Sequence, residues 1–505
     1  MRRLTFALAT CLLLACGTIP TESSDASGDG SSGTTGSTSS DAGSSTGSTS
    51  AVESTGEGGG SSTGEPEALP WQLPEVWGVP VLEDENPDEN IVEVTLVADE
   101  VEVPFSGDET IAMLAYNGTV PGPLLQAKVG DEVIVHFENR LDEPTTVHWH
   151  GLRISEDMDG NPRIQDPVQP GEGFTYRYVV EDAGSYWYHP HVNTNVQLEM
   201  GMQAPMSVHD PADPVFDLER FLVLDDILLE NGQFPPFLGS HMEQMHGRLG
   251  NYLLVNGQGS VAQVDVQQGT VERWRLVNTS NARTMNLQIS GASFRVVGSD
   301  GGRLAEPYTT ARIQMAVGQR YDVEVHYDTV GTAELTSFVL ALDELGEVVE
   351  QPIPMLQATV EASDEPTGTF EWVAVEPEPE RAIDGDASLT FDVVQGPDGT
   401  LQWTINGESM PTEPLHTFAT EDTIRLLLVN DAGPEHPFHL HGQFFRIVSD
   451  GRPETDQPGL KDTVLVPGQS VVEVIAYMDN PGRWMAHCHI LEHAELGMMG
   501  EFVIE

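Results

Sequence analysis

The stretch His487-Cys488-His489-Ile490-Leu491-Glu492-His493, close to the end of the chain, carries an unusual set of donor atoms. It places a cysteine thiolate between two imidazoles, and Met498 follows with a thioether. Two nitrogens, a thiolate and a distant thioether are the ligands of a blue electron-transfer copper. If the stretch is a strand, side chains alternate between its faces, so His487 and His489 point away from Cys488. The stretch therefore predicts a copper site on one face and a second site on the other.

The composition limits the class of protein. The chain has 505 residues and 39% hydrophobic content, enough for about three folded domains. Its formal net charge of -58 argues against nucleic-acid binding, because phosphate contacts need clustered lysine and arginine. The acidic surface could attract cationic substrates, metal ions included, or serve solubility alone.

The first residues predict export. A positively charged start and an apolar run ending at Ala15 are typical of a secretory signal peptide over residues 1–15. The Leu-Leu-Ala before Cys16 resembles a bacterial lipobox, which implies cleavage before Cys16 and lipidation of that residue. Residues 16–69, rich in Ser, Gly and Thr, predict a disordered tether. We expect a protein anchored in the cell envelope, at the periplasm or outer membrane, that contacts the membrane only through this lipid.

The cysteine count excludes a disulfide in the folded part. Cys11 leaves with the signal peptide and Cys16 is the expected lipid site, so Cys488 is the remaining cysteine. A lone cysteine in an exported protein invites oxidation unless it is buried or bound to metal. This count therefore favours a metal ligand at Cys488.

From about residue 70, short alternating runs and Pro-Gly turns predict an all-β chain. Residues 130–139, 269–278 and 421–430 are similar strands that each end in asparagine, which indicates an internal repeat. Residues 184–191 also align with 482–489.

The repeat aligns the histidine pairs. Paired histidines follow the first and third asparagines at the same spacing, whereas the middle repeat has Leu287 and Ile289 there. In the first repeat, Thr145 and Pro190 occupy the positions of His436 and Cys488. The first and third repeats could therefore meet around a metal cluster, with the middle repeat as a spacer that binds no metal.

The motifs His148-Trp149-His150-Gly151, His189-Pro190-His191, His436-Pro437-Phe438-His439-Leu440-His441 and the terminal stretch together resemble the multicopper oxidases. This family includes laccases, bilirubin oxidases and bacterial copper-resistance oxidases. The resemblance extends over residues 70–505. It implies three cupredoxin-like Greek-key β-sandwich domains, which we expect at 70–210, 211–362 and 363–505.

The resemblance also implies four copper ions: one type 1, one type 2 and two type 3. By motif position, the type 1 ligands are His436, Cys488, His493 and, axially, Met498. The type 2 ligands are His148 and His439. The type 3 ligands are His150, His189, His191, His441, His487 and His489. Met499 adjoins Met498, and spacing from Cys488 is the reason for choosing Met498.

Acids near the cluster are expected to supply protons. Asp159 matches the acid that relatives place near the type 2 copper; a turn-forming Asp-Gly is the alternative interpretation. Several bacterial relatives carry glutamate directly after the last type 1 histidine. Here that position is Ala494, followed by Glu495.

The resemblance implies an enzyme that oxidises a donor one electron at a time and reduces O₂ to water. Metal-oxidising relatives often carry a methionine-rich insert over the type 1 site, and this chain has only the short segment His241–His246. We therefore expect a laccase-like oxidase of phenols or aromatic amines, acting as a monomer. Oxidation of Cu(I), Fe(II) or Mn(II) is the alternative. A copper-binding electron carrier would leave the cluster histidines unexplained.

Overall fold

In the computed structural model, strands are the main regular structure of the described residues, as the alternating pattern predicted. The structure describes residues 79–106, 109–214, 216–259, 261–342, 348–363, 375–377, 379–449 and 457–505. All of these residues belong to one compact unit. No helix within these ranges is long and apolar enough to cross a membrane. The predicted signal peptide, tether and lipid site at Cys16 lie outside the described residues.

The first repeat forms two four-stranded sheets, ordered β2-β1-β4-β6 and β3-β8-β7-β5. Its strands are β1 (Ile91–Ser106), β2 (Glu109–Tyr116), β3 (Leu125–Lys128), β4 (Glu132–Asn139), β5 (His148–His150), β6 (Gly173–Val179), β7 (Gly184–His189) and β8 (Ala204–His209). Apolar side chains of both sheets share one buried cluster, for example Val135 of β4 and Tyr188 of β7. The two sheets therefore pack as a sandwich.

The middle repeat forms a larger sandwich, with sheets ordered β10-β9-β12-β17-β14-β15 and β11-β19-β18-β13-β16. Its strands are β9 (Leu218–Ile227), β10 (Tyr252–Val255), β11 (Ala262–Gln267), β12 (Val271–Asn278), β13 (Met285–Ser290), β14 (Ser293–Ser299), β15 (Gly302–Tyr308), β16 (Ile313–Met315), β17 (Arg320–His326), β18 (Gly331–Leu342) and β19 (Val348–Glu361). Leu287 and Ile289 are buried in its apolar core. The positions that carry histidine in the other repeats thus serve packing here.

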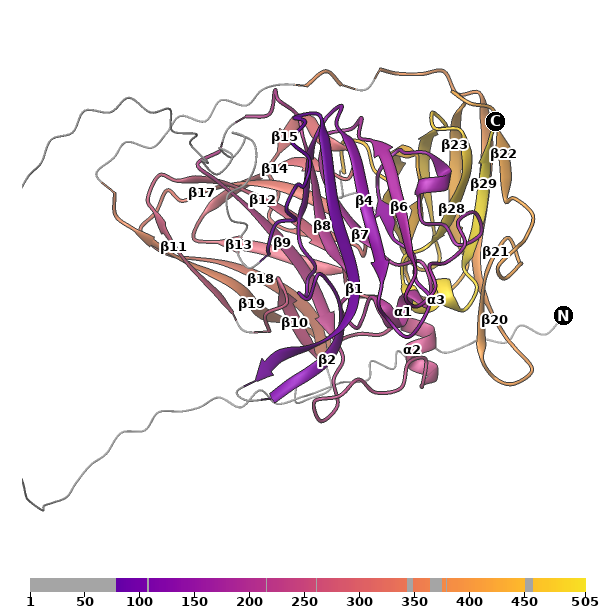
Figure 1. The fold of residues 1–505 in the computed structure, drawn as a ribbon, viewed down its shortest axis with the longest axis horizontal. Helices are drawn as coiled ribbons and strands as arrows, with labels where there is room; N and C mark the ends of the chain where they lie inside the picture. Colours follow the sequence, from indigo (N-terminus) through magenta and orange to yellow (C-terminus); the bar gives the residue numbers. More distant parts are fainter. Residues whose placement is uncertain are drawn as a thin grey trace, which may run out of the picture. The chain divides into compact units, whose positions relative to one another are not determined.

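The third repeat has two five-stranded sheets, ordered β21-β20-β23-β27-β25 and β22-β29-β28-β24-β26. Its strands are β20 (Gly385–Gln395), β21 (Leu401–Ile405), β22 (His416–Phe418), β23 (Thr423–Asn430), β24 (His436–Leu440), β25 (Phe444–Ser449), β26 (Thr463–Val466), β27 (Ser470–Tyr477), β28 (Gly482–Cys488) and β29 (Met499–Ile504). Short helices occur as η1 (Glu156–Met158), α1 (Thr194–Gln197), α2 (His241–His246) and α3 (Leu491–Glu495). Figure 1 shows the strands in chain order, from indigo β1 to yellow β29.

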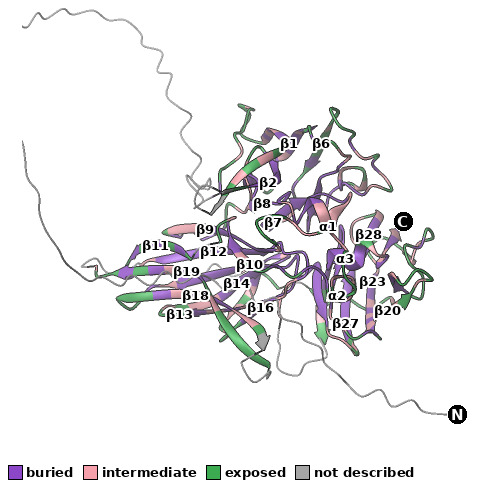
Figure 2. Ribbon diagram, turned by 90° about the horizontal axis from the view of Figure 1, so that it is seen from below, coloured by how far each residue is buried: buried purple, intermediate pink, exposed green. Residues whose placement is uncertain are grey.

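All three sandwiches share one topology. Each sheet contains one parallel pair at equivalent positions: β1 with β4 and β3 with β8, β9 with β12 and β11 with β19, and β20 with β23 and β22 with β29. Three cupredoxin-like domains are therefore present, as the resemblance implied. The predicted domain boundaries, after residues 210 and 362, fall between β8 and β9 and between β19 and β20. In Figure 2 the central residues of most strands are buried, and exposed residues occur at the ends of β18, at the start of β19 and along β20.

The repeated asparagine has a structural cause. Asn139, Asn278 and Asn430 end the equivalent strands β4, β12 and β23 and are buried. The side-chain oxygen of each accepts the backbone N–H two residues later, at 3.0, 3.2 and 2.9 Å. The side-chain amide of each donates to backbone carbonyls further along the chain, such as Val168 and Met315. A short polar side chain can close this turn, which explains why the three strands end alike.

Candidate metal centres

The first candidate site lies where β24, β28 and α3 meet. It contains His436, Cys488 and His493, all buried. The Cys488 Sγ lies 3.5 Å from His436 Nδ1 and 3.7 Å from His493 Nδ1, and the two nitrogens are 3.2 Å apart. Burial lowers the pKa of His436 to about 3 and raises the pKa of the Cys488 thiol. Neutral imidazoles and a buried thiol that ionises on binding suit a metal ion.

Met498 and Met499, the two candidate thioether ligands, differ in their surroundings. Met498 is fully buried in the same apolar cluster as Cys488, and its carbonyl accepts the Cys488 N–H at 3.1 Å. Met499 lies opposite His487 in the β28–β29 ladder and lines a cavity together with His487, away from Cys488. This arrangement supports Met498, and not Met499, as the thioether ligand.

The other eight candidate ligands gather between the first and third domains. Their ring nitrogens form overlapping groups with atoms within 4.8 Å of one another: His148 with His189 and His191, His148 with His150 and His439, His150 with His189 and His489, and His191 with His441 and His487. The repeat register explains this meeting, because His148 lies opposite His189 just as His439 lies opposite His487. His487 and His489 thus belong to this cluster and Cys488 to the other site. Strand alternation accounts for His487, and His489 follows the end of β28 at Cys488.

Hydrogen bonds leave imidazole nitrogens free for a metal. In His148, His189 and His439, Nδ1–H donates to a backbone carbonyl, at 2.9, 3.0 and 3.0 Å. Their Nε2 atoms have no hydrogen-bond partner among the described residues. The Nε2 atoms of His441 and His487 face each other at 3.0 Å. Burial lowers the pKa of His189, His439, His441 and His487, so these rings are neutral and the cluster fits metal ions.

Asp159 lies beside this cluster, as predicted. Its buried carboxylate accepts the His441 Nδ1–H at 2.8 Å and lies 3.2 Å from His148 Nδ1. The next residue, Gly160, has φ +81°, and a Cβ there would lie 2.1 Å from the Val147 carbonyl oxygen. The Asp-Gly turn and the histidine contact therefore occur together, because the turn at Gly160 holds the Asp159 carboxylate beside His148 and His441.

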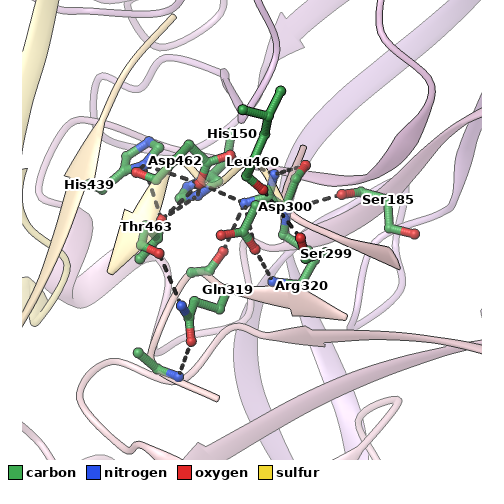
Figure 3. Close-up of polar contacts among 12 residues, drawn as sticks. His150, Ser185, Ser299, Asp300, Gln319, Arg320, His439, Leu460, Asp462 and Thr463 are labelled. Atoms are coloured by element: carbon green, nitrogen blue, oxygen red, sulfur yellow. Dashed lines mark hydrogen bonds and ion pairs between the residues drawn. The ribbon is translucent and has the colours of Figure 1, made fainter. Parts of the chain in front are cut away.

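A second acid, Asp462, lies just before β26 and beside the cluster. Its Oδ1 accepts the His150 Nε2–H at 3.3 Å, and its backbone carbonyl accepts from His439 (Figure 3). Burial alone would raise the pKa of this carboxyl. The Arg320 guanidinium and the histidine hydrogen bonds outweigh burial and hold the pKa well below its usual range. No histidine motif includes Asp462, so the sequence carried no signal for it.

Helix α2, from the middle domain, covers the Cys488 site. His493 Nε2–H donates to the Met245 carbonyl at 3.1 Å, and Trp403 Nε1–H donates to the Gln244 carbonyl at 2.9 Å. The rings of Trp403 and His493 lie 3.9 Å apart between centroids. Although the segment His241–His246 is short, it therefore lies against a candidate copper ligand.

A cavity of about 200 Å³ reaches the histidine cluster. Its lining includes His189, His191 and His487 together with Ala494 and Glu495. It offers a path by which a small molecule can approach these histidines. The Glu495 carboxyl lies at the wall of this cavity. It adjoins Ala494, the position where several bacterial relatives carry glutamate.

Gly318 packs closely against two histidines of the cluster, His150 and His489. It has φ +84°, and a Cβ would lie 3.0 Å from both His150 Cε1 and His489 Cδ2. We expect Gly318→Ala to displace these rings and to weaken copper retention by the cluster about tenfold, while the blue absorption of the Cys488 site remains. Copper analysis and chelator challenge would measure this. The control Gly118→Ala has φ +79° with nothing within 4 Å of the new Cβ, and equal copper loss in both variants would contradict the prediction.

Comparisons with known proteins agree with this geometry. Three family models described as multicopper oxidase match residues 98–213, 183–333 and 383–505. The multicopper oxidase MmcO of Mycobacterium tuberculosis is 31% identical over 438 residues, which cover 78% of this chain and 83% of that protein.

Solved structures of multicopper oxidases are similar to this chain in fold. A multicopper oxidase from Campylobacter jejuni, described as a metallo-oxidase, has a TM-score of 0.76 and 26% identity, covering 84% of this chain and 94% of its own. A laccase-like multicopper oxidase from Ochrobactrum, with activity towards lignin model compounds, has a TM-score of 0.72 and 27% identity, covering 85% and 99%. The matched residues include every histidine motif described above. This chain belongs to the multicopper oxidase family and is a copper-containing, O₂-reducing oxidoreductase.

Proposed function

We propose that the chain oxidises a small reductant at a type 1 copper and reduces dioxygen to water at a trinuclear copper cluster. The two groups His191-His441-His487 and His150-His189-His489 carry this proposal. Together they contain the six histidines expected for the type 3 pair, three for each ion. His148 and His439 remain for the type 2 copper.

The type 1 copper would be held by His436, Cys488, His493 and Met498. Bound copper supplies one-electron redox steps, and four ions can together store the four electrons that O₂ reduction requires. The chain provides the path between the sites, because Cys488 is bonded through the backbone to both His487 and His489. The Cys488 carbonyl also accepts the His487 Nδ1–H at 2.9 Å, which fixes that ring.

For the electron donor we propose a phenol or an aromatic amine. The segment over the type 1 site is six residues long, with two methionines, which is short for a dedicated metal-ion site. The Ochrobactrum relative acts on lignin model compounds.

Metal ions are the second candidate donor class. His241 and Met242 on α2 are exposed, and the formal charge of -58 would attract cations. The Campylobacter relative is described as a metallo-oxidase. An electron from either donor class would enter beneath α2, at His493.

Oxygen uptake distinguishes these donors. We expect the copper-loaded protein to bind four copper ions, to show intense blue absorption and to consume O₂ with phenols faster than with Cu(I), Fe(II) or Mn(II). Cys488→Ser should abolish the blue absorption and donor oxidation while the cluster keeps its copper. Activity confined to the metal ions would refute the phenol proposal, and one copper per chain would indicate an electron carrier instead.

Asp159 is the proposed acid beside the type 2 copper. Its carboxylate contacts both His148 and His441, so it lies close enough to take part in proton delivery. We expect Asp159→Asn, which keeps the size of the side chain, to lower turnover by about 10²–10⁴-fold while the donor still reduces the type 1 copper. Stopped-flow reduction and steady-state O₂ uptake measure the two steps. Unchanged turnover would exclude the role.

We propose further that the protein is exported and held in the cell envelope by a lipid on Cys16, as a monomer. The lipobox-like ending before Cys16 and the polar tether support this proposal. We expect Cys16→Ser to lose incorporation of labelled fatty acid and to move from the membrane fraction to the soluble fraction. Light scattering of the detergent-solubilised protein tests the monomer. Lipid labelling that persists in Cys16→Ser would refute the anchor.

A further inference from the structure

We infer that Arg320, in the middle domain, is a positioning residue for the trinuclear cluster and acts through Asp462. The inference rests on the copper ligands proposed above. It assigns a role at the copper sites to a domain that supplies none of their proposed ligands. The bond network that carries it is drawn in Figure 3.

The Arg320 guanidinium holds the Asp462 carboxylate in a fixed orientation. Nη1–H donates to Asp462 Oδ1 at 2.7 Å and Nη2–H donates to Oδ2 at 2.6 Å. Both residues are buried, with 0% and 1% of their side chains exposed. This paired geometry defines the plane of the carboxylate more tightly than a single bond would.

The remaining donors of Arg320 tie it to the backbone. Nε–H donates to the Ser185 carbonyl at 3.0 Å, Nη2–H to the Asp300 carbonyl at 2.9 Å and Nη1–H to the Gly318 carbonyl at 3.2 Å. All five guanidinium N–H groups therefore have partners. Ser185 belongs to β7 of the first domain and Asp462 to the third, so this one side chain connects all three domains.

Asp462 in turn selects the nitrogen that His150 presents to the cluster. Because Asp462 Oδ1 accepts the His150 Nε2–H, Nδ1 of His150 is left to face His489 Nε2 at 3.3 Å. His148 and His439 show the opposite arrangement, with Nδ1 hydrogen-bonded and Nε2 free. A partner that fixes the tautomer and ring orientation of a metal-binding histidine tunes metal affinity. Nδ1 of His150 is therefore the nitrogen that would be available to a metal ion in the cluster.

Thr463 links the acid to a second proposed ligand. Its Oγ1–H donates to Asp462 Oδ1 at 2.8 Å. Thr463 Oγ1 also lies 3.1 Å from His439 Nδ1. The Asp462 backbone carbonyl accepts from that same nitrogen at 3.0 Å. Moving the Asp462 carboxylate would therefore disturb a proposed type 3 ligand and a proposed type 2 ligand together.

The middle domain offers a matched control. Arg220 forms a similar paired contact with Glu272, with two bonds of 2.8 Å, and both side chains are buried. The neighbours of Glu272 are Trp274 and Tyr327, in the apolar core of that domain. Arg220→Lys therefore disturbs a buried ion pair of the same kind without touching a proposed copper ligand.

The experiment compares copper-loaded Arg320→Lys, Asp462→Asn and Arg220→Lys with the unmodified protein. Readouts are copper per chain, the rate of copper loss to a chelator, the type 2 signal in electron paramagnetic resonance and the blue absorption. We expect Arg320→Lys and Asp462→Asn to lose cluster copper about 10–100-fold faster, with an altered type 2 signal and unchanged blue absorption. Arg220→Lys should lower the unfolding temperature and leave the type 2 signal unchanged.

An unchanged type 2 signal and unchanged copper loss in folded Arg320→Lys would overturn the inference. If that variant does not fold, Asp462→Asn decides in the same way, because it keeps the side-chain volume and removes the paired acceptor. Equal effects in Arg320→Lys and Arg220→Lys would also overturn it. Failure of the unmodified protein to bind four copper ions would instead refute the proposed function, so the two outcomes are distinguishable.

Discussion

The alternation of side chains along a strand is the constraint on which both metal centres depend. On β28, Cys488 faces His436 and His493, while His487 faces the opposite way into the cluster, and His489, directly after the strand, joins the same cluster. The neighbouring β24 follows the same rule: His436 and His439 are three residues apart and belong to different sites. Two adjacent strands therefore form a wall with one centre on each side. The centres are close because their ligands are neighbours in the chain.

The middle domain has a larger role than the predicted spacer. Its interior is an ordinary apolar core, in which Leu287 and Ile289 replace the paired histidines. Its periphery contacts both centres: the Met245 carbonyl accepts a hydrogen bond from His493, and Gly318 lies against His150. This domain therefore contacts both candidate copper sites although its interior supplies no ligand.

The sequence predicted what local rules determine. The all-β class, the register of the repeat and the grouping of eight histidines follow from alternation and spacing, and Asp159 follows from its motif. The contact between Arg320 and Asp462 was not predictable, because the two residues are 142 positions apart and neither belongs to a motif. The segment His241–His246 was set aside for its length, yet its contact with His493 is made by a backbone carbonyl, which any residue could supply.

Buried charge explains why acids accompany the cluster. Imidazoles whose facing ring nitrogens lie 3.0 and 3.3 Å apart, as in the pairs His441–His487 and His150–His489, repel one another until a cation takes up their lone pairs. Bound cations inside a protein need compensating negative charge, because burial removes the water that would otherwise solvate them. Asp159 and Asp462 provide that charge by accepting hydrogen bonds from the ligand rings. The histidines belong to the first and third domains, so bound copper would also hold those two domains together.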